Sequence, residues 1–233
     1  GRRRSFQIFD HDGRAVHKIF LTDQSDEAAY DKLISDFKAD NQLPGIEVLP
    51  PLPKAVTLPD QEVDVENLRA HWRRMTDVHQ YHGMLKDFNV GRQQGMRLAG
   101  PEFAERLSSD ALKVLLEKAS ESGISIMVFV GNSGAIQFHT GPIKTIREMG
   151  EWINIMDPTF TLHLRMGRIF EAWIVRKPIR EGMVTTIELY DRDLNNFAIF
   201  CGERKRKDPE NPDWQKLAES LPCLENTMAA VAE

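Results

Sequence analysis

Three of the seven histidines fall in one short stretch, at His71, His79 and His82. Apolar side chains around them recur every three or four residues, as on one face of an α-helix: Leu68, Trp72, Met75, Val78, Tyr81 and Leu85. At about 100° per residue, His71, Met75 and His82 fall near one line, with His79 at the edge of the apolar face. The pattern predicts a single helix, ended by Gly91, that presents imidazoles beside an apolar surface.

Imidazoles at this spacing suit haem iron better than zinc. A zinc site uses at least three protein ligands, and the spacing places no cysteine or third histidine beside His79 and His82. Haem iron needs one proximal histidine, and apolar contacts and the propionates supply the remaining binding. The alternative, that each histidine is an ordinary structural residue, is the commoner case for a single histidine on an apolar face.

Four cations are candidates for binding carboxylates. Arg92 and Arg97 follow the histidine stretch, while Lys177 and Arg204 lie at the ends of predicted strands far along the chain. A guanidinium can hold a carboxylate through two parallel charge-assisted hydrogen bonds. The alternative for each cation is a solvated surface residue. Together with the imidazoles, they indicate a flat apolar ligand that carries a metal and carboxylates.

Composition limits the class of protein. The 233 residues are 41% hydrophobic and 28% charged, which is ordinary for a globular protein with a sizeable core. A net charge of −5 argues against nucleic acid as the main partner, although the basic run 204–207 keeps a nucleic-acid-binding regulator as a distant alternative. We expect a cytoplasmic protein without membrane insertion, because it has two cysteines, no secretory leader and no bilayer-length apolar run.

Periodicity predicts an α+β fold, a large antiparallel β-sheet with flanking helices. A hairpin at 5–22 and a helix capped by Ser25 or Asp26 come first, and prolines then mark an extended linker. A helix at 109–122, ended by Gly123, precedes a hairpin at 124–141. The remaining predicted elements are strands at 152–155, 159–166, 169–175, 183–190 and 197–201, and a helix at 213–221.

An internal repeat links the two ends of the chain. SFQIFDHD, from Ser5, matches TIELYDRD, from Thr186, and in both copies a second strand and a helix follow. We therefore expect two structural repeats, of which the first is incomplete in this chain. The predicted domains are the closing hairpin and helix of the first repeat (1–42), a proline-rich linker (43–63) and a complete second repeat (64–233). The chain is then expected to be a piece of a longer protein.

Several long motifs resemble one known family, the haemin-degrading and haem-trafficking factors of bacterial haem-uptake systems (HemS/ChuS/HmuS type). They are MTDVHQYHGMLK, IMVFVGNSGAIQFHTGPI, EWINIMDPTFTLHL, EAWIVRKP and the closing YDRD…CGER. The resemblance covers nearly the whole chain. It implies two repeats, each a large antiparallel sheet with packed helices, and haem in a cleft between them.

The resemblance also assigns roles to residues of this chain. It implies that His79 is the axial ligand of the haem iron and that His82 is an alternate ligand. It makes Arg92 a partner of a haem propionate, and it places Lys177 and Arg204 along the same cleft. No separate catalytic side chain is implied, because the haem iron carries the chemistry.

This chain departs from the family in the strand before the G-x-R motif. Ile199 and Cys201 stand where many members have Gln and Tyr, which removes two polar groups, and the family's distal arginine would lie before Gly1. The leading expectation is a cytoplasmic protein of a bacterial haem-uptake system that traffics haem or oxidatively degrades it to release iron. The alternative, which the loss of the two polar groups makes more plausible, is a non-enzymatic haem chaperone that delivers to a separate haem oxygenase. The expected partners are haem, a haem importer or oxygenase and an unidentified electron donor, and an exposed half-cleft would favour a homodimer.

Overall fold

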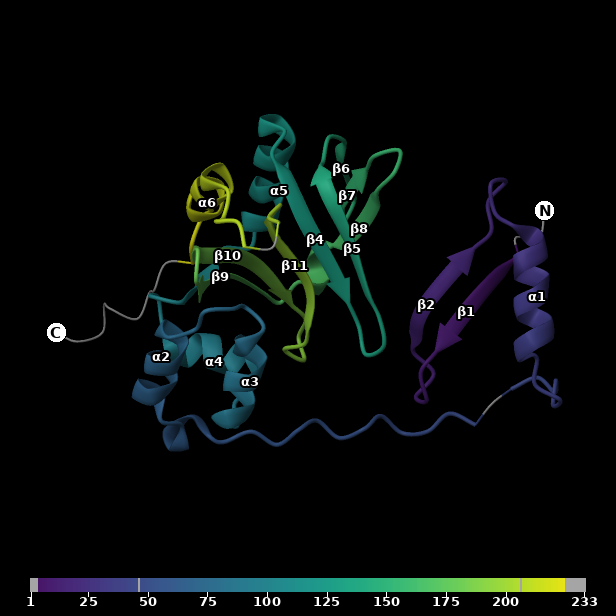
Figure 1. Ribbon diagram of the computed structural model, residues 1–233, viewed down its shortest axis with the longest axis horizontal. Helices are drawn as coiled ribbons and strands as arrows, with labels where there is room; N and C mark the ends of the chain where they lie inside the picture. Colours follow the sequence, from purple (N-terminus) through teal and green to yellow (C-terminus); the bar gives the residue numbers. More distant parts are fainter. Residues whose placement is uncertain (1–3, 46, 206, 225–233) are drawn as a thin grey trace. The chain divides into compact units, whose positions relative to one another are not determined.

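The computed structural model describes residues 4–45, 47–205 and 207–224 (Figure 1). The chain divides into two compact units: Gly1–Ala55 with Asn132–Ala135, and Val56–Gly131 with Ile136–Glu233. Among the described residues, no helix has the length and apolar character needed to cross a membrane.

The first unit contains the predicted hairpin and helix. Strands β1 (Ser5–Phe9) and β2 (Ala15–Phe20) pair antiparallel, and α1 (Glu27–Phe37) follows. The Asp26 side chain caps α1 by accepting a hydrogen bond from the Ala29 amide, as its position predicted. Beyond α1, residues 47–59 form neither helix nor strand, as expected for a proline-rich stretch.

The second unit is built on a six-stranded antiparallel sheet in the order β3-β9-β10-β11-β4-β5. Its strands are β3 (Ala104–Leu107), β4 (Ser125–Gly131), β5 (Ile136–Pro142), β9 (Glu171–Ile179), β10 (Gly182–Tyr190) and β11 (Asn196–Gly202). A second antiparallel sheet contains β6 (Ile146–Met149), β7 (Trp152–Met156) and β8 (Thr161–Arg165). The predicted strands and the α+β class are confirmed, whereas β3 and β6 were missed because four residues are too short to show a period.

The helices of this unit are α2 (Val65–Arg73), α3 (Gln80–Asp87), α4 (Arg92–Ala99), α5 (Ala111–Ser122) and α6 (Pro212–Glu219), with single turns η1 (Asp60–Glu62) and η2 (Met166–Arg168). The predictions of α5 and α6 are confirmed, and Gly123 ends α5 with φ +66°.

The prediction of one continuous helix through the histidines is wrong, because α2, α3 and α4 are separate. Gln80 breaks the first helix: its Oε1 accepts hydrogen bonds from the amides of Thr76 (2.7 Å) and Asp77 (3.3 Å), which a continuous helix would use internally. Gly91, predicted to end the helix, is instead the N-cap of α4. The apolar period continues across the breaks because all three helices contribute to one core.

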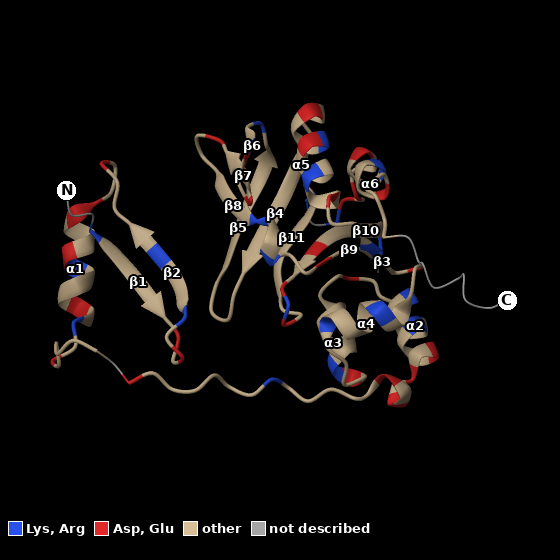
Figure 2. Cartoon of the chain, turned by 180° about the vertical axis from the view of Figure 1, so that it is seen from behind, with Lys and Arg blue, Asp and Glu red and all other residues tan. Residues whose placement is uncertain are grey.

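The large sheet separates two apolar cores. One face carries Ile174, Ile187 and Phe200 and packs against α5 and α6. The opposite face carries Val175 and Tyr190 and packs against α2, α3 and α4. Figure 1 shows these two helix groups on opposite sides of the sheet. Figure 2 shows that many acidic and basic residues lie on helices and turns, and the inner strands β9 and β10 also carry charged residues, Lys177 and Glu188 among them.

The two hairpins of the internal repeat follow the same register. Ser5 pairs with Phe20 in the first hairpin, and the matching Thr186 pairs with Cys201 in the second. Both ladders shift between the last two paired residues of the leading strand. In both turns an aspartate, Asp10 or Asp191, accepts a hydrogen bond from the amide four residues later. The sequence match thus corresponds to a match in strand pairing and turn.

Candidate functional site

His79 lies outside regular helix, at the N-cap of α3. Its side chain is 91% exposed, and its Nδ1 lies 2.6 Å from Oδ1 of Asp77. The position predicted for it, at the edge of an apolar helix face, is therefore wrong, since the helix starts only after His79. His82, one turn into α3, is also exposed.

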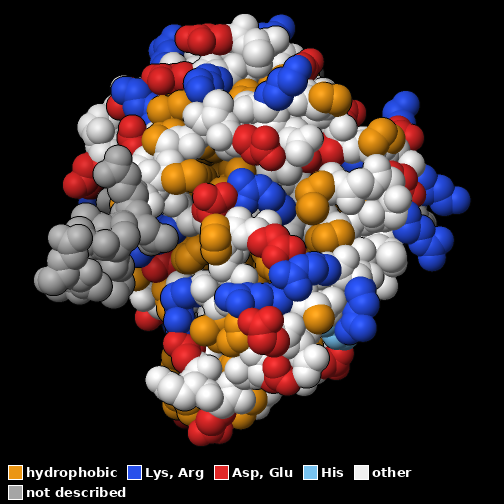
Figure 3. Space-filling model, turned by 90° about the vertical axis from the view of Figure 1, so that its left-hand side faces the viewer, with side chains coloured by type: hydrophobic (Ala, Val, Ile, Leu, Met, Phe, Trp, Pro, Cys, Tyr) orange, Lys and Arg blue, Asp and Glu red, His pale blue; other side chains and the backbone are white. Residues whose placement is uncertain are grey.

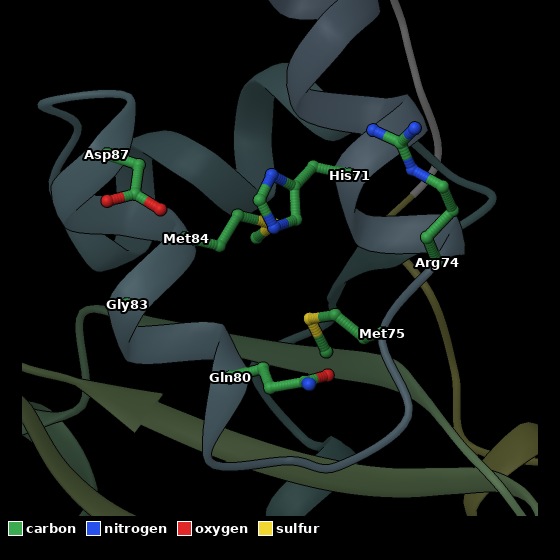
Figure 4. A pocket seen from close by; sticks show the side chains of 7 residues that line it. All are labelled: His71, Arg74, Met75, Gln80, Gly83, Met84 and Asp87. Carbon is green, nitrogen blue, oxygen red and sulfur yellow. The ribbon is translucent and has the colours of Figure 1, made fainter.

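His71 occupies a different environment from the other two histidines. It points into a pocket of about 450 Å³ between α2 and α3, which Figure 4 shows. The pocket is lined by His71, Arg74, Met75, Gln80, Gly83, Met84 and Asp87. His82 is not among these residues and lies on a different helix from His71, so the predicted line through His71, Met75 and His82 is wrong.

Arg92 and Lys177 meet at a buried carboxylate. Arg92, the first residue of α4, donates through Nε (2.8 Å) and Nη2 (2.7 Å) to the two carboxylate oxygens of Glu188 on β10. Lys177 on β9 donates from Nζ to Glu188 Oε1 at 2.5 Å. The exposed fractions of the side chains are 0% for Glu188, 5% for Lys177 and 30% for Arg92. Two of the predicted site residues are thus brought together, with an acidic residue between them.

The charges of this cluster stabilise one another. Burial alone would raise the pKa of Glu188, but Lys177 and Arg92 hold it well below its usual range. Burial lowers the pKa of Lys177, and its ion pair with Glu188 opposes that shift. For Arg92, attraction to Glu188 outweighs burial and raises the pKa. With Glu188 ionised, the cluster carries more positive than negative charge, and the Arg92 side chain reaches solvent.

Tyr81 connects the cation cluster to the histidine turn. Arg92 Cζ lies 5.1 Å and Lys177 Nζ 4.8 Å from the centre of the Tyr81 ring. Tyr81 is two residues past His79, on the first turn of α3. On the other side, the Tyr190 hydroxyl donates to Glu188 at 2.7 Å. The buried Tyr81 ring therefore contacts the two cations from the helix turn that directly follows His79.

Arg204 lies just past β11, and its Nη1 donates to the carbonyls of Lys205 (3.4 Å) and Asp208 (3.0 Å). Burial raises the pKa of Cys201 to about 12, and both Lys177 and Arg204 are close enough to oppose this shift. Arg206, within the basic run, is outside the described residues.

The same sheet face continues as an apolar surface beyond the cluster. Strand pairing places Ile199 beside Glu188 and beside Phe129, and places Phe129 beside Phe138. Cys201 pairs with Met127 in the same register. All five apolar side chains are half-buried or exposed, and the Phe129 and Phe138 rings stack at 5.9 Å. We call Met127, Phe129, Phe138, Ile199 and Cys201 the open sheet surface.

Three residues of the site were not identified from sequence. Glu188 stands between Ile187 and Leu189, and an acid inside an apolar strand was the available signal. Asp77 precedes His79 by two residues, a spacing that an Asx turn uses. Tyr81 was assigned to an apolar helix face, and its contact with the cations depends on strands distant in sequence.

Comparison with known proteins shows which family and which relatives the chain is similar to. A family model described as the haemin-degrading HemS.ChuX domain matches residues 1–37 and 89–221. The hemin transport protein HemS of Yersinia enterocolitica is 39% identical over 218 residues, which are 92% of this chain and 61% of that protein. This chain therefore spans about three fifths of the length of that relative.

Solved structures agree with this match. Holo-PhuS, a heme-binding protein from Pseudomonas aeruginosa, has 43% identity and a TM-score of 0.91 over 95% of this chain and 64% of its own. ChuS, described as an E. coli heme oxygenase, has 41% identity and a TM-score of 0.83 over 95% of this chain and 65% of its own. The resemblance predicted from the motifs is thus confirmed, and the chain belongs to the haemin-degrading HemS.ChuX domain family.

Proposed function

We propose that this chain binds haem through His79 and serves a bacterial haem-uptake pathway as a cytoplasmic haem carrier. One observation carries the proposal: an almost fully exposed imidazole lies two residues from Tyr81, the ring that Arg92 and Lys177 contact. An iron ligand and cations for carboxylates are the two polar requirements of a haem site. The relatives named as hemin transport and heme-binding proteins support the same ligand.

The described residues suit the remaining parts of haem. The open sheet surface offers apolar and aromatic contacts to a flat macrocycle. Arg92 uses only Nε and Nη2 toward Glu188, which leaves Nη1 for a propionate, and Arg204 adds a second guanidinium. Lys177 is only 5% exposed and donates to Glu188 and Thr186, so we assign it mainly to holding the Glu188 carboxylate.

The test of the ligand is haemin titration of the wild-type chain and of the variant His79→Ala, followed by Soret absorption. Without its ligand, haem should bind with at least tenfold lower affinity and a shifted ferric spectrum, with His82 substituting in part. His163→Ala, which removes an exposed histidine from β8, is the matched control and should leave both readouts unchanged. An unaltered spectrum and affinity in His79→Ala would show that the ligand is wrongly chosen.

The residues of the open sheet surface favour a haem carrier over a haem-degrading enzyme. Ile199 and Cys201 provide no strong hydrogen-bond donor beside the cluster, whereas oxygen chemistry at haem depends on the polarity and donors of the pocket. Degradation is the second candidate, because the similar ChuS is described as a heme oxygenase. Haem iron would supply that chemistry, and this chain would hold and orient the macrocycle.

The two candidates differ in what happens to bound haem. The loaded protein, prepared without oxygen, is given a reductant and then oxygen in the presence of catalase. A ring-opened product that persists with catalase supports an enzyme. Intact haem, passed to a haem oxygenase added later, supports a carrier. Loss of product only when catalase is present indicates stray peroxide chemistry.

Nucleic-acid binding is the distant alternative. Figure 3 shows acidic, basic and apolar side chains interspersed over most of one face, rather than a uniform basic patch. Arg4 forms ion pairs with Glu27 and Asp31, which reduces the positive charge that it offers. Binding to DNA that lacks a steep dependence on salt would argue against this alternative.

A further inference from the structure

The turn that carries His79 is held in place by its own side chains. Gln80 Oε1 accepts the amides of Thr76 and Asp77, and Asp77 Oδ1 accepts the amide of His79 at 2.8 Å. The backbone of the turn therefore positions the Asp77 carboxylate independently of its contact with the His79 ring. This distinguishes the pair from two long surface side chains that meet by chance.

The same carboxylate oxygen lies 2.6 Å from Nδ1 of His79. An ionised carboxylate can only accept a hydrogen bond, so Nδ1 must carry the proton of this contact. In the neutral ring Nε2 then has a free lone pair, and the ring is 91% exposed. A nitrogen lone pair facing solvent is the form of histidine that binds a metal.

His79 differs in this respect from its neighbours. Within the described part of the chain, neither His71 nor His82 has a hydrogen bond to a ring nitrogen, and His71 contacts Phe88 edge to face. A hydrogen bond between two exposed side chains contributes little to stability, so folding gains little from Asp77 beside the ring. A carboxylate on the second nitrogen of a ligating histidine, in contrast, fixes the tautomer and raises its basicity as a ligand.

We propose that Asp77 is a positioning residue for haem, which fixes His79 as the Nδ1–H tautomer and strengthens Nε2 as a donor to iron. This inference rests on the proposed function, because it takes His79 as the axial ligand. A stronger donor favours ferric over ferrous iron. Asp77 would thus determine which of the histidines binds haem and how readily the bound haem is reduced.

The first measurement uses the haem-free chain and no ligand. Long-range ¹H–¹⁵N correlation spectra of the histidine rings report which nitrogen carries the proton. Wild-type His79 should show protonated Nδ1 and bare Nε2. In Asp77→Ala the ratio of this tautomer to the other should fall at least threefold. Asp87→Asn, which removes a negative charge from the other end of α3, should leave it unchanged.

The second measurement uses haem-loaded protein. Asp77→Ala should lower ferric haem affinity by about tenfold, the low end for loss of an outer-shell partner, and should raise the reduction potential of bound haem. Asp77→Asn keeps an oxygen for the turn but removes the charge, so its values should lie between those of wild type and Asp77→Ala. Circular dichroism checks that each variant is folded. We expect both variants to fold, because Asp77 lies in an exposed turn.

The outcomes separate this inference from the proposed function. If His79→Ala loses haem while Asp77→Ala leaves tautomer, affinity and potential unchanged, the ligand stands and the role of Asp77 is overturned. If His79→Ala binds haem as wild type does, both proposals are overturned. If the wild-type ring carries its proton on Nε2, the role of Asp77 is overturned whatever the haem experiments show.

Discussion

Glu188 lies on β10 between two cations, with its side chain fully buried. An unpaired carboxylate in that position would be costly, so the residue depends on Lys177, Arg92 and the Tyr190 hydroxyl. The dependence is mutual, because two cations at this depth would repel each other without it. Glu188 therefore controls how much positive charge this sheet face offers to a ligand.

Glu188→Gln should destabilise the chain by about 3–5 kcal/mol at neutral pH, because it leaves Lys177 buried without a counter-charge. Urea unfolding gives the free energy. Glu181→Gln, an exposed charge at the turn of the same hairpin, is the control and should change stability by less than about 0.5 kcal/mol. A loss for Glu188→Gln as small as that of the control would mean that the ion pairs contribute little.

The difference between wild type and Glu188→Gln should also depend on pH. The pKa of Glu188 is lowered in the folded protein, so its contribution is fully present above the usual value of 4.5 and is lost as pH falls toward the folded value. The free energies of unfolding of the two proteins should therefore begin to converge as pH falls below about 4.5. A difference that stays constant down to the acid limit would contradict this assignment.

At the scale of elements, the packing of α6 on β11 depends on a glycine. Trp214 of α6 is buried and donates from Nε1 to the Thr185 carbonyl at 2.9 Å. A Cβ added at Gly202 would lie 2.6 Å from Trp214 Cγ and 2.8 Å from its Cβ. The helix therefore lies close to the strand only because residue 202 has no side chain.

Gly202→Ala should cost about 1–3 kcal/mol, because the added methyl forces Trp214 and α6 outward. Thermal or urea unfolding measures the loss, and fluorescence of Trp214 should change with its displacement. Gly83→Ala provides the contrast: it lies inside α3 with open space around it, so it should stabilise by about 0.5–1 kcal/mol. Equal stability for the two variants would argue against the close packing of α6.

At the scale of the whole chain, the two compact units differ in how much they bury. The buried hydrophobic residues of the described chain run from Val63 to Leu221, and α1 has no buried residue. Ile19, Phe20 and Phe37 of the first unit are 45%, 48% and 81% exposed. Most of the hydrophobic stabilisation therefore comes from the second unit.

Amide hydrogen exchange should reveal this difference. Amides of β1, β2 and α1 should exchange much faster than those of β9 and β10, since segments with few buried contacts open with a smaller free energy. Exchange followed by mass spectrometry of peptides resolves these segments. Equal protection in both units would mean that the first unit is stabilised to the same degree as the second.

Local sequence patterns were sufficient for most of the elements. These patterns act on neighbouring residues: strand alternation, the Asp26 cap, the helix end at Gly123 and the proline-rich stretch. The secondary structure predicted from each of them matches the structure. The motifs also identified the family, because long runs of matching residues carry more information than any single histidine.

Tertiary structure decided the environment of the site residues. The histidine stretch has a helical period, but Gln80 and Asp77 accept backbone amides and divide it, which a period cannot reveal. Arg92, Lys177 and Glu188 come together only because α4 packs on the face formed by β9 and β10. Contacts between residues so distant in sequence depend on the pairing of strands. For this reason the sequence identified the cations Arg92 and Lys177 but not Glu188, the carboxylate that they share.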